Sequence, residues 1–259
     1  MLVSGGMDVP LATRLDAALG GLEPDPEERR QLVRLMRLFA DRETPPGTAG
    51  RFPLYEELHG RFMDVVTAGE GEKIEERFLD LYAHVHMHEA PYSKAERRLV
   101  DASGGYWCHA GGLSPLLRAG PWIRPDTVSA DLGAGNGLQG LLLQALYPHR
   151  LTIQLEISAA MVDIGRELQA WLEVPPERVR WLVADLMEAP LPDADFLYLY
   201  RPVRPRGPGI AFYERLARHL EGSRTEVVFS IADCLDEFLG DGFEAFYDDG
   251  HLTCYRRSR

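Results

Sequence analysis

Asp131-Leu132-Gly133-Ala134-Gly135-Asn136-Gly137 is the stretch that decides the fold class of this chain. An apolar run typical of a β-strand, residues 127–130, leads into the acid, and an apolar, helical pattern follows from Leu138 to Leu146. A strand that turns into a helix through glycines brings bare backbone N–H groups close to a ligand, at the positive end of the helix dipole. The stretch therefore predicts a ligand-binding turn between a strand and a helix.

The same letters fit two kinds of cofactor. Residues 135–140 match the dinucleotide fingerprint GxGxxG, and Glu156 follows about 20 residues on, where such folds hold a ribose. Asp131 would repel a pyrophosphate placed beside it, but it suits a cofactor that carries a cationic sulfonium and an ammonium. Downstream, residues 179–186 read as a third strand ending in Asp185. These acids favour S-adenosylmethionine (SAM) over NAD(P).

The glycine turn with its preceding acid resembles motif I of the class I SAM-dependent methyltransferases. The resemblance implies that Asp131 faces the methionine or sulfonium end of SAM and that the turn admits the cofactor along its backbone. Glu156, followed by Ile157, is expected to accept both ribose hydroxyls and to lie outside the core. Asp185 is expected to accept from the adenine amino group, beside the Leu186 N–H. The cofactor residues implied are thus Asp131, Gly133, Ala134, Gly135, Gly137, Glu156, Ile157, Asp185, Leu186 and Tyr200.

Simpler interpretations of these residues stay open. Asp131 could stabilise the start of the helix, and the glycines could make only a tight turn. Glu156 could be a surface acid at a strand end, and Asp185 could be a helix cap.

The rest of the chain separates into two patterns. Residues 1–100 show amphipathic helical periodicity and no strand alternation, which predicts a helical N-terminal domain that caps the site. Residues 101–259 are expected to form the SAM-binding domain, because strands and helices alternate from Thr127 onward and imply a parallel sheet covered on both faces. Residues 243–247 and 252–256 flank an Asp-Gly turn and predict a closing β-hairpin. The fold class is α/β, a Rossmann-like sheet that ends in an antiparallel hairpin, as the class I resemblance implies. The strands are expected at 128–131, 151–156, 179–184, 196–200 and 226–231. The helices are expected at 11–22, 55–66, 74–88, 137–146, 159–172 and 210–220. A further helix is expected to start at residues 24–28, with Leu32, Leu35, Met36 and Phe39 on its apolar face.

The sequence says less about the residues that would contact the methyl acceptor. Tyr200 ends the fourth predicted strand, where acceptor chemistry sits in this fold, and it is the first candidate to face the acceptor. Tyr106 is a candidate for lining the acceptor pocket, and His109 for accepting a proton. Methyltransferases that act on base or amide nitrogens resemble one another in carrying Asn/Asp-Pro-Pro-aromatic after that strand. This chain has Arg201-Pro202-Val203, which argues against nucleobase and glutamine methylation.

A metal site is not expected. His84 and His88 share a helix face at the i, i+4 spacing that can hold a metal, and His86 lies between them. Histidines at a helix end are more often exposed polar positions, and a third ligand from Glu89 or Cys108 has no support in the pattern.

Composition limits the partners and the compartment. The formal net charge is −12, and the one local basic run, residues 201–206, is too short to form a nucleic-acid surface; a nucleic-acid partner is therefore not expected. No apolar run approaches the roughly 18 residues that span a bilayer, so no membrane association is expected. The three cysteines include no CxxC pair, and no secretory signal is visible, which favours the cytoplasm.

The sequence thus predicts methyl transfer from SAM to a small molecule or a protein side chain. Two alternatives are a SAM-binding module without catalysis and an NAD(P)-dependent oxidoreductase. The acceptor and the oligomeric state are not predicted.

Overall fold

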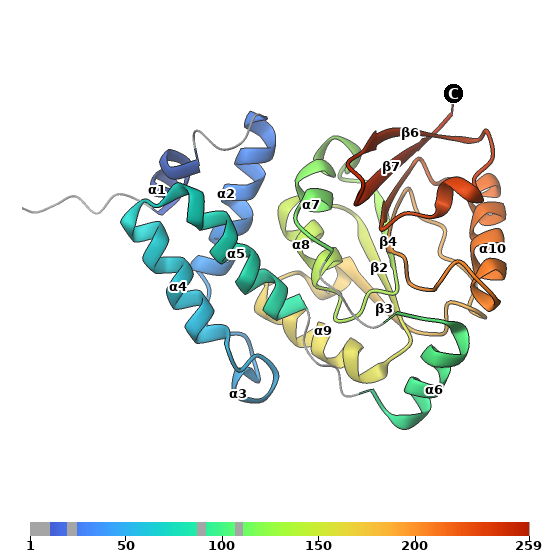
Figure 1. Cartoon of the computed structure of the whole chain (residues 1–259), viewed down its shortest axis with the longest axis horizontal. Helices are drawn as coiled ribbons and strands as arrows, with labels where there is room; N and C mark the ends of the chain where they lie inside the picture. The colour runs from blue at the N-terminus through green and yellow to red at the C-terminus, as the bar shows by residue number, and fades with distance from the viewer. Residues whose placement is uncertain (1–10, 20–24, 87–91, 107–110, 259) are drawn as a thin grey trace, which may run out of the picture.

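The computed structural model describes residues 11–19, 25–86, 92–106 and 111–258 (Figure 1). Seven strands form one sheet in the order β3-β2-β1-β4-β5-β7-β6. The first five strands are parallel, whereas β7 runs antiparallel to both β5 and β6. The strands are β1 (Val128–Leu132), β2 (Leu151–Glu156), β3 (Val179–Val183), β4 (Phe196–Tyr200), β5 (Val227–Ile231), β6 (Phe243–Asp248) and β7 (Leu252–Arg257).

This strand order confirms the predicted fold class, a Rossmann-like sheet of the class I methyltransferase type that closes in an antiparallel hairpin. The chain reverses between β1 and β4: β2 and β3 extend the sheet to one side, and β4 and β5 extend it to the other. In open α/β sheets ligands bind at such a reversal, outside the carboxyl ends of the strands. The topology therefore places the candidate site beside Asp131, near the end of β1.

Helices cover both faces of the sheet. One face is covered by α7, α8 and α9, and the other by α10, whose Phe212, Tyr213 and Leu216 are buried against Leu197 and Leu199 of β4. Ser158 caps α9 by accepting a hydrogen bond from the Met161 N–H (3.4 Å). The helices are α1 (Leu11–Leu19), α2 (Pro26–Ala40), α3 (Thr48–Arg51), α4 (Tyr55–Ala68), α5 (Gly71–His86), α6 (Lys94–Ser103), α7 (Ser114–Arg118), α8 (Leu138–Leu146), α9 (Ala159–Trp171) and α10 (Pro208–Gly222).

The N-terminal helices share a hydrophobic core with the helices of the sheet. In Figure 1, α1 to α5 form an outer layer beyond α8 and α9. The Phe39 ring meets both Phe78 of α5 and Trp171 of α9 edge-on, at centroid distances of 5.2 and 5.6 Å. The Arg34 Nη2 donates to the Leu146 carbonyl at 2.7 Å. Because apolar faces of both parts meet directly, the helical part is not a freely tethered unit. Its boundary near residue 100 stays a prediction.

Helix α6 was not predicted from the sequence. Ser93 and Glu96 form a capping box at its start, and Gly104 ends it with a left-handed φ of 73°. Glu96 also accepts a hydrogen bond from the Ala159 N–H (3.1 Å), which fixes α6 beside the start of α9. The helix therefore belongs beside the sheet, whereas α1 to α5 lie on the other side of α8.

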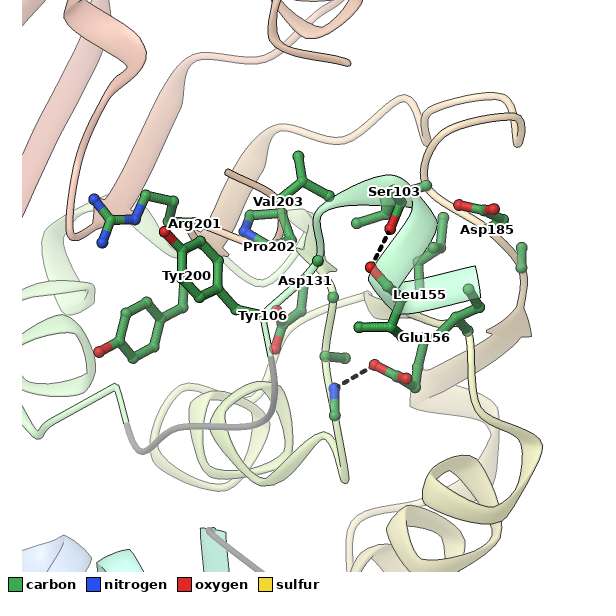
Figure 2. A pocket seen from close by; sticks show the side chains of 18 of the residues that line it. Ser103, Tyr106, Asp131, Leu155, Glu156, Asp185, Tyr200, Arg201, Pro202 and Val203 are labelled. Carbon is green, nitrogen blue, oxygen red and sulfur yellow. Dashed lines mark hydrogen bonds between the residues drawn. The ribbon is translucent and has the colours of Figure 1, made fainter. Parts of the chain in front are cut away.

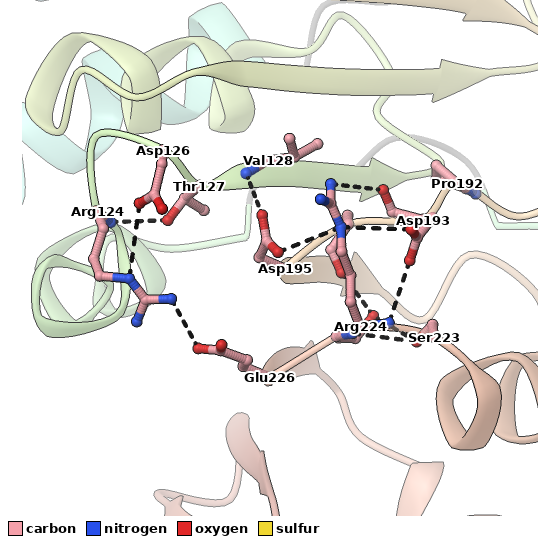
Figure 3. A network of polar contacts seen from close by, with 12 residues as sticks. Arg124, Asp126, Thr127, Val128, Pro192, Asp193, Asp195, Ser223, Arg224 and Glu226 are labelled. Carbon is pink, nitrogen blue, oxygen red and sulfur yellow. Dashed lines mark hydrogen bonds and ion pairs between the residues drawn. The ribbon is translucent and has the colours of Figure 1, made fainter.

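Charged side chains join the amino ends of the strands, opposite the candidate site. Asp195 accepts a hydrogen bond from the Val128 N–H at 2.7 Å and pairs with Arg224 at 3.3 Å (Figure 3). Arg124 pairs with Glu226 at 3.1 Å. These contacts hold the starts of β1, β4 and β5 together, so the charged side chains at this edge of the sheet stabilise the fold. No helix in the part of the chain that the structure describes is long and apolar enough to cross a membrane.

Candidate functional site

A pocket opens at the carboxyl ends of β1 to β4 and has a volume of about 260 Å³ (Figure 2). Nine of the ten predicted cofactor residues line it. The lining residues come from the strand ends and the loops after them, from α6 and the residues on both sides of it, from the start of α8, and from the end of α5: His86, Tyr92, Val100, Ser103, Gly105, Tyr106, Asp131, Gly133, Ala134, Gly135, Gln139, Leu155, Glu156, Ile157, Ala184, Asp185, Leu186, Tyr198, Tyr200, Arg201, Pro202 and Val203.

The pocket has an ordered layout. In Figure 2, Asp185 and Glu156 lie on one side, Tyr106, Tyr200 and Arg201 lie on the other, and Asp131 lies between them. Three acids therefore follow one another along the pocket, with aromatic and cationic side chains beyond the third.

The glycine turn does not offer the bare N–H groups that the sequence suggested. The amides of Gly133 and Ala134 both donate to the Leu155 carbonyl at 2.9 Å, and the Gly137 amide donates to the Ala134 carbonyl at 2.8 Å. The Gly135 amide donates to Glu156 Oε2 at 2.9 Å. Since each of these four amides already has a partner in the protein, the turn is a poor anion cradle.

Gly137 is the predicted cofactor residue that does not line the pocket. It starts α8 with a left-handed φ of 68°, and a Cβ there would lie 2.3 Å from the Trp181 ring. Glycine is therefore required for the turn and for close packing on β3.

Glu156 is buried, so the expectation that it lies outside the core is wrong. Its side chain is 5% exposed. Oε2 accepts from the Gly135 N–H at 2.9 Å, and Oε1 accepts from the Ser158 N–H at 3.0 Å. Burial raises the pKa of Glu156 to about 7, although the hydrogen bonds to Ser158 and Gly135 oppose that shift. One carboxylate thus holds the glycine turn against β2 while it faces the pocket.

Asp131 is a buried acid that has no hydrogen-bond partner or ion-pair partner among the described residues. It is 4% exposed, and burial, with a smaller contribution from Glu156, raises its pKa to about 8. Among the described residues, no hydrogen bond reaches its carboxylate. Burial without a compensating partner disfavours the charged form of this carboxyl, and a cationic group in the pocket would favour the charged form and pair with it.

Asp185 forms a local turn after β3. Its Oδ1 accepts from the Met187 N–H at 2.8 Å, which fits the capping interpretation. The turn is fixed from behind by Arg215 of α10, which donates to the carbonyls of Leu186 and Ala189. Asp185 is only half-buried and also lines the pocket, so capping and ligand binding are compatible here.

Tyr106 and Tyr200, the candidates for facing the acceptor, both line the pocket, on the side away from Asp185 (Figure 2). The Tyr106 N–H donates to the Pro202 carbonyl at 3.1 Å, and Gly105 bridges Val203 in antiparallel fashion. The loop after α6 is therefore joined to the end of β4. His109 lies outside the described residues.

His84 and His86, two of the three histidines predicted not to bind a metal, have different surroundings. His84 Nε2 accepts a hydrogen bond from the Leu54 N–H at 3.2 Å, so this ring faces α4. His86 is buried and lines the pocket. His88, Glu89 and Cys108 lie outside the described residues, and no cluster of potential metal ligands occurs among the residues that are described.

Sequence reasoning missed the contribution of α5 and α6 to the pocket. His86 reaches it because Asn136 Nδ2 donates to the Val85 carbonyl at 2.8 Å and ties the end of α5 to the glycine turn. Val100 and Ser103 reach it from α6. The capping box could have revealed α6 from the sequence, but no local signal identifies His86.

Comparisons with known proteins give structural likenesses only. No protein-family model matches the sequence, and no curated protein matches it. The chain is similar to TrmN from Thermus thermophilus, with 18% identity over 56% of this chain and 48% of that chain, at a TM-score of 0.44. It is similar to an RNA methyltransferase from Salinibacter ruber in complex with S-adenosyl-L-homocysteine, with 20% identity over 64% of this chain and 92% of that chain, at a TM-score of 0.39. A putative rRNA methylase from Clostridium thermocellum shows 9% identity over 56% of this chain and 96% of that chain, at a TM-score of 0.44.

These likenesses concern the fold alone, and the strand order is stronger evidence for the fold than they are. The chain spans about half the length of TrmN.

The predicted absence of a nucleic-acid partner is overturned by these comparisons, because similar structures include RNA and rRNA methyltransferases. The prediction rested on a net charge of −12, which describes the whole chain. A nucleic acid contacts one local surface, so an acidic total does not exclude it.

Proposed function

We propose that this protein binds SAM in the pocket at the carboxyl ends of β1 to β4 and transfers its methyl group to an acceptor. The observation that carries the proposal is the row of three acids along one pocket: Asp131 near the end of β1, Glu156 at the end of β2, and Asp185 just after β3. Their order matches the three parts of SAM, with the cation at Asp131, the ribose at Glu156 and the adenine at Asp185.

The glycine turn argues against a dinucleotide. A pyrophosphate needs free N–H groups at the start of the helix, whereas the amides of Gly133, Ala134, Gly135 and Gly137 all donate within the protein. A pyrophosphate there would also face the buried Asp131. An acid without a partner fits a cationic ligand instead.

Each residue has a definite task in this proposal. Asp131 would hold the methionine or sulfonium end of SAM, and Glu156 would accept from the ribose hydroxyls while it keeps the turn in place. Asp185 and the Leu186 N–H would read the adenine edge, beside the apolar wall that Leu155 and Ile157 provide. When bound, SAM supplies a methyl carbon already activated by its sulfonium, so the protein mainly positions the acceptor and excludes water.

The acceptor would enter beside Tyr106 and Tyr200, beyond Asp131. The acceptor could be a small molecule, a protein side chain or an RNA. The predicted helical domain would shape this entrance, since His86 at the end of α5 lines the pocket.

Calorimetry tests the cofactor, and methyl transfer tests the activity. SAM and S-adenosyl-L-homocysteine (SAH) should both bind at one site, and NADH should not bind. Transfer of labelled methyl groups from SAM to total RNA, protein or small-molecule fractions should then identify the acceptor. SAM binding with no transfer to any fraction would favour the non-catalytic module, and NADH binding without SAM binding would favour the oxidoreductase.

A further inference from the structure

Three arginines follow β4 in the segment Arg201-Pro202-Val203-Arg204-Pro205-Arg206, which we call the arginine segment. It is a local basic run in a chain with a net charge of −12. Arg201 lines the pocket, and its φ of 23° is a conformation that L-residues seldom adopt. Backbone strain of this kind is found mainly where the surrounding structure and a function require it.

The Tyr106 ring lies against two guanidinium groups. The central carbons of Arg201 and Arg204 are each 5.2 Å from the centroid of this ring, so they lie within about 10 Å of one another, twice that distance. The contact is held by the backbone, because Tyr106 N–H donates to the Pro202 carbonyl (3.1 Å) and Arg204 N–H donates to the Gly104 carbonyl (3.0 Å). These bonds hold the loop after α6 against the arginine segment, of which Arg201 lines the pocket and Arg204 lies next to Tyr106.

Neither guanidinium has an acid as its partner. Many arginines of this protein form ion pairs, such as Arg51 with Glu167 and Arg224 with Asp195. Among the described residues, no carboxylate pairs with Arg201 or Arg204. Two like charges on one aromatic ring repel each other mildly, and an anion between them would turn repulsion into attraction. Guanidinium groups are the preferred ligands of phosphate and carboxylate, and they also stack on planar rings.

We propose that Arg201 and Arg204, which both lie against the Tyr106 ring, together bind an anionic group, phosphate or carboxylate, of the methyl acceptor. The inference rests on the proposed function, because the site lies where the acceptor would enter. In Figure 2, Arg201, Tyr106 and Tyr200 lie together on the side of the pocket away from Asp185. Tyr106 and Tyr200 add aromatic rings beside the charges, which suits an acceptor whose anionic group adjoins a planar ring.

Anion binding to the SAH-saturated protein tests this assignment. The probes are 5′-AMP, benzoate and a short single-stranded oligouridylate, titrated by calorimetry or NMR in 50 mM and 300 mM NaCl. At least one probe should bind, and its affinity should fall as salt rises. A phosphate source would be indicated by 5′-AMP or the oligonucleotide, and a carboxylate source by benzoate.

The double variant Arg201→Gln/Arg204→Gln should bind that probe at least tenfold more weakly, with an SAH dissociation constant within twofold of the wild type. The matched control Arg180→Gln/Arg218→Gln removes the same charge at exposed positions of β3 and α10 and should leave probe affinity unchanged. If the double variant does not fold, Arg204→Gln alone keeps Arg201 in place and should still weaken probe binding at least threefold.

The outcomes separate the two proposals. No probe binding to the SAH-bound wild type, or an equal loss in the control variant, would overturn the anion site while SAM binding stands. An absence of SAH binding in the wild type would instead refute the proposed function.

Discussion

Replacing Glu156 by alanine should weaken both the cofactor site and the fold, because one carboxylate serves both. Its two oxygens accept from the Gly135 and Ser158 amides at 2.9 and 3.0 Å, and the side chain is 5% exposed. Glu156→Ala leaves two buried N–H groups without an acceptor.

The expected loss of stability is about 2–4 kcal/mol. An orphaned buried donor costs roughly 1–3 kcal/mol, and there are two of them. We expect a loss below the full sum of these two costs, because burial itself disfavours the charged form of Glu156, as its raised pKa of about 7 indicates. A protein of this size shifts its melting temperature by about 2–4 °C for each kcal/mol, so we expect a fall of about 4–16 °C.

SAH affinity should fall separately. Loss of a charged acceptor for the ribose hydroxyls costs about 1–3 kcal/mol, which is about five- to 150-fold in the dissociation constant. Calorimetry at low temperature measures this on the fraction that stays folded, and thermal unfolding measures the stability. Asp163→Ala removes an exposed acid of α9 that pairs only with exposed Arg166, so it should change both quantities little. A Glu156→Ala protein with wild-type melting and wild-type SAH affinity would refute the reasoning.

Three further predictions concern the same site. The pKa of Asp131 is about 8 in the unliganded folded protein against 3.8 in the unfolded chain, so the free energy of unfolding should fall as pH rises through that range. Because SAM is cationic, it should bind more tightly as pH rises and should displace the Asp131 proton. Calorimetry in buffers of different ionisation enthalpy detects that proton release. Gly137→Ala adds a clash with the Trp181 indole ring to an unfavourable positive φ and should lower the free energy of unfolding by about 2–5 kcal/mol, measured by urea unfolding. Gly69→Ala is the control: Gly69 also has a positive φ, but no atom would contact the added Cβ, so the loss should be about 1–2 kcal/mol. Equal losses in the two variants would contradict the packing argument. Asn136→Ala removes the hydrogen bond to the end of α5 and should lower stability by about 1–3 kcal/mol and also reduce methyl transfer; unchanged transfer would show that this helix does not shape the entrance.

The sequence predicted the sheet well because its signals are local. Residues 151–156 and 196–200 are the predicted and observed limits of β2 and β4, since short apolar runs between turn residues leave little choice of boundary. The acids at the strand ends could also be placed, because parallel strands bring their carboxyl ends to one edge.

Contacts between distant segments could not be predicted in this way. The glycine amides are taken by Leu155 and Glu156, and this follows from how β2 meets the turn in space. His86 lies in the pocket because the neighbouring Val85 carbonyl accepts a hydrogen bond from Asn136, which is 51 residues away in the sequence. Helix α6, in contrast, has a local signal in the sequence, the capping box of Ser93 and Glu96, which hydrophobic periodicity alone does not reveal.

A crystal structure of the protein with SAH would test the assignment of the three acids directly. We expect the adenine beside Asp185 and Leu186, the ribose hydroxyls on Glu156, and the amino-acid end near Asp131, with the sulfur directed toward Tyr106 and Tyr200. Density for SAH outside this pocket, or with its adenine at the Tyr200 end, would contradict the proposed assignment of the three acids.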